Sequence, residues 1–196
     1  MKWLGFFFLI LIILAGCTSD LEREDIPVAY GVRLSEPIPP SQFRKDMQRV
    51  KAFSPNEVVL ELELAAHDTT ALPYIRRTGR AQLTKLLPIL QELHLQPSIA
   101  VIESRDKPLF FRDTTDFTRW FAHYYFELER VLERSAGHPL KRLVIGNEFK
   151  ELERRPPHEW RYLIDSLRAL SKTKLVYSTT PDRVQKVQVW PLVDEI

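Results

Sequence analysis

Asn147 and Glu148 place an amide and a carboxylic acid side by side at the end of a predicted strand. The residues before them, 142–146, form a short β-branched and leucine-rich run that stops at a glycine, which is typical of a strand. Pro156 and Pro157 follow within one loop length and open a helix with an apolar face. A carboxylate at the C-terminal tip of a strand that leads into a helix is where α/β barrels carry their chemistry. The residue types alone fit equally well with two side chains that only end a strand and hydrogen-bond a nearby loop.

Polar side chains stand at or just beyond the C-terminal ends of all the predicted strands. They are Arg33, Glu63, Glu103, Glu148 and Thr180. Parallel strands that close into a barrel would gather these groups into a ring at one end. Solvated strand ends would explain any one of them, but the whole series favours the ring. Glu61 lies deeper in its strand, where a buried ion pair with Arg33 is as good an explanation as a ligand contact.

The elements that must position this ring alternate along the chain. The predicted strands are 28–34, 58–64, 98–102, 142–146 and 174–180, and residues 193–196 begin a sixth. The predicted helices are 39–53, 80–94, 115–135 and one that begins at 156. Residues 67–78 are expected to form a polar loop. Strands that alternate with helices in this way predict a parallel sheet with right-handed crossovers.

The pattern within the strands favours a barrel over a flat sheet covered on both sides. In the second strand, leucines at 60, 62 and 64 share one face, while Glu61 and Glu63 share the other. In the first strand, Tyr30, Val32 and Leu34 alternate in the same way with Ala29, Gly31 and Arg33. A doubly wound sheet buries both faces and would avoid this alternation. A barrel packs its apolar face outward on the helices and tolerates polar groups near its mouth.

We therefore expect an α/β fold over residues 28–196, an incomplete TIM-type barrel of about five β/α units and the start of a sixth strand. Trp120 and Trp160 fall at core spacing on predicted helices and are expected to be packing residues, although aromatic side chains also line sugar sites.

Composition narrows the possible functions. The chain has 196 residues, enough for one domain with a sizeable core, and its formal net charge of +2 argues against nucleic acid as a partner. The five histidines show no metal-ligand spacing, and the one cysteine excludes an internal disulfide. We expect no metal site and no cofactor.

The cysteine stands in an informative place, Cys17. Lys2 precedes an apolar run too short for a comfortable membrane span, and Leu14-Ala15-Gly16-Cys17 resembles a bacterial lipobox. This resemblance implies a signal peptide at 1–16, acylation of Cys17 and a polar tether over 17–27. A short transmembrane anchor with an incidental cysteine is the alternative. We expect a membrane-anchored lipoprotein of the bacterial cell envelope and favour the outer membrane, although these residues do not distinguish between the membranes or their faces.

Several longer runs occur in a meaningful order, namely DFTRWFAHYYFELERVL, RLVIGNE, EWRYLIDSLRAL, KLVYSTT and VWPLVDEI. Together they resemble the retaining (β/α)8 glycoside hydrolases, and most of all the mannanase-type family 113. The resemblance runs from about Tyr30 to Ile196. It implies that Glu148 is the general acid/base, that Asn147 contacts a substrate hydroxyl, and that an oligo- or polysaccharide is the partner. Arg33 and Glu103 would be further substrate-binding residues at the mouth.

Two departures from the family pattern qualify this implication. A retaining enzyme needs a second carboxylate about 5–5.5 Å from the first as nucleophile, and the family supplies it from the seventh strand, whereas this chain ends where the sixth begins. The third-strand loop reads Glu103-Ser104-Arg105-Asp106 where a histidine-containing loop is expected.

Three hypotheses therefore stay open. The chain is a fragment of a longer glycosidase, or a half-barrel that binds glycan without cleaving it, or a structural envelope lipoprotein. In each case an open barrel leaves bare edge strands, so we also expect self-association through those edges.

Overall fold

The computed structural model describes residues 29–67, 71–111 and 116–195. The predicted signal peptide, the acylated Cys17 and the tether lie outside these residues, so they stay predictions.

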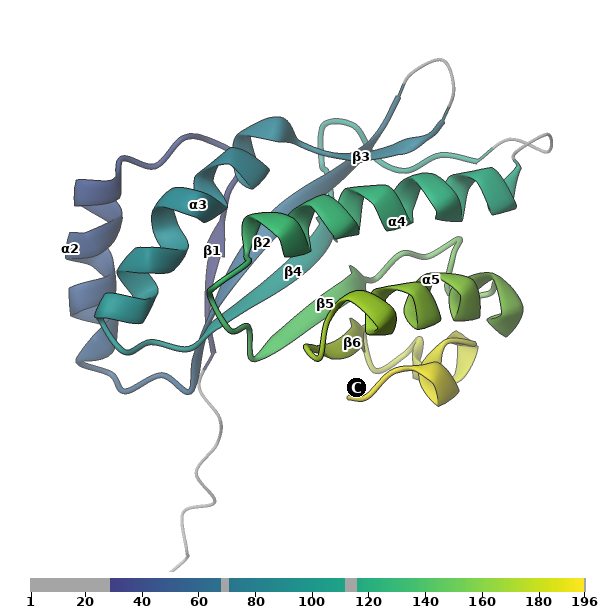
Figure 1. Ribbon diagram of the computed structural model, residues 1–196. Helices are drawn as coiled ribbons and strands as arrows, with labels where there is room; N and C mark the ends of the chain where they lie inside the picture. The colour runs from purple at the N-terminus through teal and green to yellow at the C-terminus, as the bar shows by residue number, and fades with distance from the viewer. Residues whose placement is uncertain (1–28, 68–70, 112–115, 196) are drawn as a thin grey trace, which may run out of the picture.

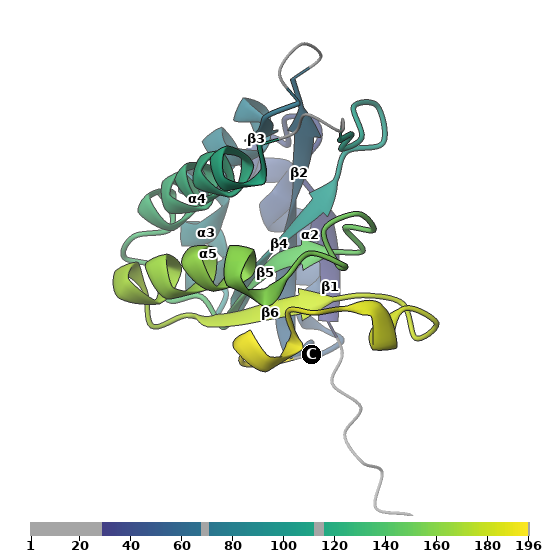
Figure 2. The ribbon, with the colours of Figure 1, turned by 90° about the vertical axis from the view of Figure 1, so that its right-hand side faces the viewer.

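The core of the fold is a parallel sheet with helices on one side (Figures 1 and 2). Five parallel strands lie in the order β1-β2-β4-β5-β6. Their bounds are β1 Ala29–Arg33, β2 Glu57–Ala66, β4 Pro97–Glu103, β5 Arg142–Asn147 and β6 Lys174–Ser178. The helices between them are α2 Pro40–Lys51, α3 Arg77–Glu92, α4 Phe117–Arg134 and α5 Pro157–Leu170. The predicted alternation and the partial TIM-type architecture are confirmed.

The chain continues after β6 through two short 3-10 helices, η1 Val184–Lys186 and η2 Trp190–Leu192. It then returns to the sheet, where Glu195 forms a parallel bridge with Val176 of β6. The predicted start of a sixth parallel strand is therefore present at this position.

The prediction of a polar loop over residues 67–78 is wrong for its second half. Residues Pro73–Ile75 form a short strand, β3, which pairs antiparallel with the end of β2. β2 extends beyond Leu64 because Ala65 and Ala66 are small and buried. Leu64, Ala65 and Ala66 pair with Ile75, Tyr74 and Pro73 in turn. The Ile75 N–H also donates to the Glu127 carboxylate of α4 at 2.7 Å.

The two faces of β2 behave as the alternation predicts. Leu60, Leu62 and Leu64 are fully buried beneath the helices, whose own stripes supply the rest of the core. Trp120 and Trp160 are 1% and 0% exposed, so both are packing residues as predicted. Because the main hydrophobic core lies between this face and the helices, hydrophobic burial holds the helices to the sheet.

The opposite face carries small residues and a row of charges at the N-terminal end of the strands. Glu57 of β2 accepts a hydrogen bond from Ser98 of β4 at 2.6 Å and lies 3.0 Å from Arg142 Nε of β5. Arg142 also lies 3.3 Å from Glu195, which pairs with Lys174 of β6 at 2.5 Å. This row ties four neighbouring strands and the returning chain together on the concave side of the sheet.

Candidate functional site

Glu148 lies directly after the last residue of β5, the fourth parallel strand along the chain. Its backbone is left-handed, with φ of 57°, and its N–H donates to the Ser178 carbonyl at 2.9 Å. A non-glycine residue in this region stores strain, and such residues cluster at functional sites. Within the part of the chain that the structure describes, the Glu148 carboxylate has no hydrogen bond and no ion pair. It is half-buried, as is the neighbouring Asn147.

The end of β5 departs from regular strand geometry just before this pair. Its register with β6 shifts between Val144 and Asn147, and the Ile145 carbonyl accepts a hydrogen bond of 2.6 Å from the Tyr124 hydroxyl of α4. Gly146 is required by close approach, because a Cβ there would lie 2.5 Å from the ring of Tyr177. The glycine in the GNE run therefore makes room for a buried tyrosine beneath Glu148.

The loop after Glu148 is packed onto its surroundings. The Phe149 N–H donates to the Tyr177 hydroxyl at 3.1 Å, and the Trp160 indole N–H donates to the Leu152 carbonyl at 3.1 Å. Burial raises the pKa of the Tyr177 hydroxyl far above its usual range, and the negative charge of Glu153 raises it further. The hydroxyl therefore stays protonated at any ordinary pH.

Two glutamates of β2 form ion pairs, one with the end of β1 and one with the residue that follows β3. Arg33 lies 3.2 Å from Glu61, with the two side chains 36% and 29% exposed. The predicted pair therefore exists, but it is not buried. Glu63 lies 3.0 Å from Arg76, which also reaches Asp106 at 3.1 Å. Arg33 is thus already engaged within the chain, and no described contact links it to Glu148.

Glu103 ends β4, and its carboxylate accepts a hydrogen bond of 2.7 Å from the Leu109 N–H, which fixes the loop that follows. It also faces the loop after Glu148 across a cavity of about 180 Å³. The cavity is lined by Glu103, Leu109, Phe111, Phe149, Lys150, Glu151 and Leu152. Glu103 and the residues next to Glu148 are therefore brought together. Thr180 stands farther along, after β6, where its hydrogen bond lowers the pKa of the Asp182 carboxyl.

Several residues of this region were not identified from the sequence. Arg76 falls within the loop predicted over 67–78, where nothing distinguishes it from its neighbours. Tyr124 and Tyr177 are fully buried core residues, and the sequence pattern shows only that role. Glu153 and Arg183 lie 30 positions apart in two loops and form an ion pair of 2.6 Å. No local pattern marks such a pair, because Glu153 stands in a highly charged run, Lys150-Glu151-Leu152-Glu153-Arg154-Arg155, that gives no sign of its burial.

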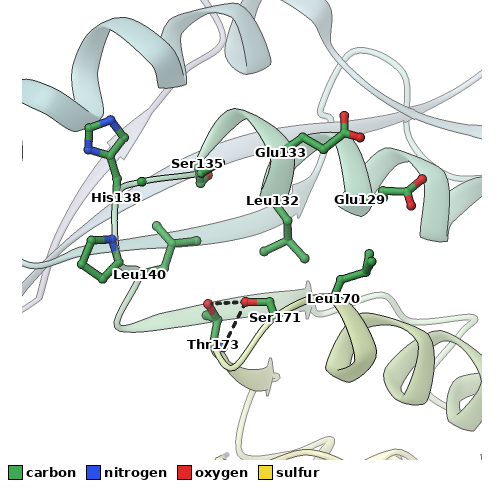
Figure 3. A pocket seen from close by; sticks show the side chains of 12 residues that line it. Glu129, Leu132, Glu133, Ser135, His138, Leu140, Leu170, Ser171 and Thr173 are labelled. Carbon is green, nitrogen blue, oxygen red and sulfur yellow. Dashed lines mark hydrogen bonds between the residues drawn. The ribbon is translucent and has the colours of Figure 1, made fainter.

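A larger cavity of about 590 Å³ lies at the other end of the strands (Figure 3). It is formed by the C-terminal ends of α4 and α5 and by the segments that lead into β5 and β6, with Leu132, His138 and Leu170 among its lining. Since the catalytic face of an α/β barrel is at the C-terminal end of its strands, this cavity is separate from the candidate site.

Two further findings concern the described ranges only. The described ranges hold no group of three or more histidine, cysteine, aspartate or glutamate residues arranged to bind a metal ion. They also hold no helix that is both long and apolar enough to span a membrane.

Comparison with solved structures identifies the fold. A GH113 β-1,4-mannanase superposes with a TM-score of 0.70 at 18% sequence identity, over 85% of this chain and 59% of that one. A GH113 β-mannanase from Alicyclobacillus acidocaldarius, in complex with ManMIm, gives 0.66 at 16% identity over 85% and 58% of the two chains. An endoglucanase, Cel5A of Pseudomonas stutzeri, gives 0.51 at 12% identity over 77% and 51%. No protein-family model matches the chain, and no curated protein matches it.

These findings show a partial TIM-type α/β fold, similar to the corresponding part of the GH113 β-mannanase structures. The resemblance drawn from the sequence motifs is thus matched at the level of structure, while identities below one fifth establish the fold alone. The chain spans about 59% of the length of the mannanase to which it is similar.

Proposed function

We propose that this chain is a glycan-binding domain related to β-mannan hydrolases, with Glu148 in the position of the general acid/base and Asn147 as a contact for a sugar hydroxyl. The observation that carries the proposal is the unpaired Glu148 carboxylate, at the C-terminal end of the fourth parallel strand, on a strained backbone. The fold supports it, because solved structures of similar fold include GH113 β-1,4-mannanases. β-Linked mannan oligosaccharides are therefore the first substrate class to test.

We infer that these 196 residues have at most trace hydrolase activity by themselves. Retention requires a second free carboxylate about 5–5.5 Å from the acid/base. Three further carboxylates towards this end of the strands already have partners: Glu61 pairs with Arg33, Glu63 with Arg76, and Glu103 accepts from Leu109. These contacts support a domain that binds glycan without cleaving it.

Anchoring forms part of the same proposal. The lipobox-like run before Cys17 supports acylation and attachment to the bacterial cell envelope, and we favour the outer membrane. A domain held in this way would meet polysaccharide at the cell surface or in the periplasm. Self-association is a further proposal, supported by β1, whose residues are largely exposed and which pairs with β2 alone among the described strands.

Calorimetric titration with mannan and glucan oligosaccharides tests the central proposal. Asn147→Ala and Glu148→Gln should each weaken binding several-fold. Glu92→Gln is the matched control, because Glu92 pairs with Arg44 at the surface between α2 and α3, at the opposite end of the strands. Binding that is equal in all four proteins would place the glycan elsewhere, and absence of binding in the unaltered chain would refute the proposal.

A further inference from the structure

The most deeply buried charge near the candidate site belongs to Glu153, in the loop that connects β5 to α5. Its side chain is fully buried, and Arg183 donates to its carboxylate from both Nε and Nη2, at 2.8 and 2.6 Å. The Thr179 hydroxyl donates to the other carboxylate oxygen at 2.7 Å. A buried carboxylate is stable in a folded chain only when its hydrogen bonds are complete in this way.

This cluster joins two loops that are far apart in sequence. Arg183 also donates to the Lys150 carbonyl at 3.3 Å, and the Gln188 N–H donates to the Glu153 carbonyl at 2.9 Å. These bonds hold the segment after β6 against the segment after Glu148. Figure 2 shows β5 and β6, the strands that lead into the two segments, side by side. Neither Arg183 nor Glu153 lines the cavity beside Glu103, so neither is placed to touch a ligand there.

The same two segments hold the unusual backbone of Glu148. Its N–H donates to the carbonyl of Ser178, and the next N–H, of Phe149, donates to the hydroxyl of Tyr177. Ser178 is followed at once by Thr179, the donor to Glu153. A left-handed glutamate persists only where its surroundings over-determine it, and here the surroundings are the end of β6 and the loop that Arg183 fastens.

We propose that Arg183 is a positioning residue, which acts through Glu153 to hold Glu148 in its left-handed conformation. Arg183 has no described contact with Glu148 or Asn147, and its effect passes through the 148–153 and 177–183 segments, including its hydrogen bond to the Lys150 carbonyl. The claim that this conformation serves glycan binding rests on the proposed function. The claim that Arg183 maintains the conformation is independent of the proposed function.

The test uses NMR of the full chain, labelled with ¹⁵N, in two independent readouts. A positive φ brings the amide and α protons of one residue close together, so Glu148 should show a strong intraresidue cross-peak between them. In Arg183→Met that cross-peak should weaken, and the Glu148 and Phe149 amides should exchange with solvent at least about tenfold faster, because their acceptors are no longer fixed. Arg183→Lys keeps the charge without the paired donors and should recover part of both signals.

A matched control and a milder variant keep the test decisive. Arg168→Met removes another ion pair near β6, that with Asp194 at 2.6 Å, without touching the two loops, and should leave the Glu148 signals unchanged. Thr179→Val removes one hydroxyl donor and should give a smaller change if Arg183→Met proves too unstable to study. A Glu148 cross-peak and exchange rate that are the same in Arg183→Met, Thr179→Val and Arg168→Met would overturn the proposal.

Oligosaccharide binding is measured on the same proteins as a separate arm. Weaker binding in Arg183→Met, partly restored in Arg183→Lys, would extend the positioning role to recognition. If the unaltered chain binds no oligosaccharide, the proposed function fails while the two NMR readouts still decide the role of Arg183.

Discussion

Gly146→Ala should destabilise the chain although it adds one methyl group to a strand. The new Cβ would lie 2.5 Å from Cε2 and 3.0 Å from Cδ2 of Tyr177, and 3.0 Å from Phe149. Tyr177 cannot withdraw easily, because its fully buried ring packs edge-on against Trp160 and Trp190. Overpacking of this kind costs about 1–3 kcal/mol. Because the Tyr177 ring has little room to move, we expect a cost near the upper end of this range. Loss of glycine freedom in the unfolded chain offsets about 0.4–1 kcal/mol, which leaves a net cost of about 2 kcal/mol.

The measurement is urea unfolding followed by tryptophan fluorescence, with thermal melting as a second assay. At about 2–4 °C per kcal/mol for a chain of this size, the melting temperature should fall by about 4–8 °C. Gly31→Ala is the matched control in β1, since its Cβ would meet only the flexible end of Glu61 at 3.2 Å and should change stability little. In a Tyr177→Leu background the cost of Gly146→Ala should largely vanish. A Gly146→Ala chain as stable as Gly31→Ala would refute the argument that close approach requires this glycine.

Four further predictions follow from the sequence and the contacts. Cys17→Ser should abolish incorporation of labelled fatty acid and leave the protein unprocessed or soluble; equal labelling would contradict the lipobox interpretation. The isolated mature chain should self-associate or fold marginally, so a monomeric mass by light scattering together with a sharp melt would count against open-edge pairing. Purified chain should show no more than trace turnover of β-mannan or β-glucan oligosaccharides beside Glu148→Gln, and robust turnover lost in that variant would show a complete site. Hydrogen bonding from the Leu175 N–H and from Arg168 lowers the pKa of Asp194. The stability that this group contributes should therefore be present above its unfolded pKa of about 3.9 and be lost as pH falls below it, whereas Asp194→Asn should flatten that acid limb of the stability profile.

The sequence was sufficient to predict the sheet and its faces because both depend on local periodicity. Alternating leucines at 60, 62 and 64 place one face of β2 against helices whatever follows later in the chain. The same holds for the helical stripes and for the strand that ends at Asn147. These features need no knowledge of a distant partner, so pattern alone identifies them.

Features that depend on a distant partner could not be predicted. β3 is three residues long and exists because the end of β2 and a carboxylate from α4 complete its hydrogen bonds. Arg76 joins Glu63 to Asp106, and Arg183 joins two loops, and each pairing is visible only once the chain is folded. Gly146 illustrates the same limit, since its necessity comes from Tyr177 on the adjacent strand.

The ring of polar strand ends was predicted correctly in place for Arg33, Glu103, Glu148 and Thr180, whereas Glu63 lies inside β2, which runs on to Ala66. The roles of these residues were predicted less completely. Barrel topology brings such groups to one end regardless of function, and there most of them satisfy one another. Arg33 and Glu63 each pair with an opposite charge, and Glu103 accepts a backbone N–H. Buried or half-buried charges that find partners contribute to structure. Among the members of the ring, the residue that departs from this rule is Glu148, which keeps a free carboxylate on a backbone conformation that its neighbours must maintain. The distinction between a structural ring and a binding site therefore lies in which member is left without a partner, and a sequence pattern does not contain that information.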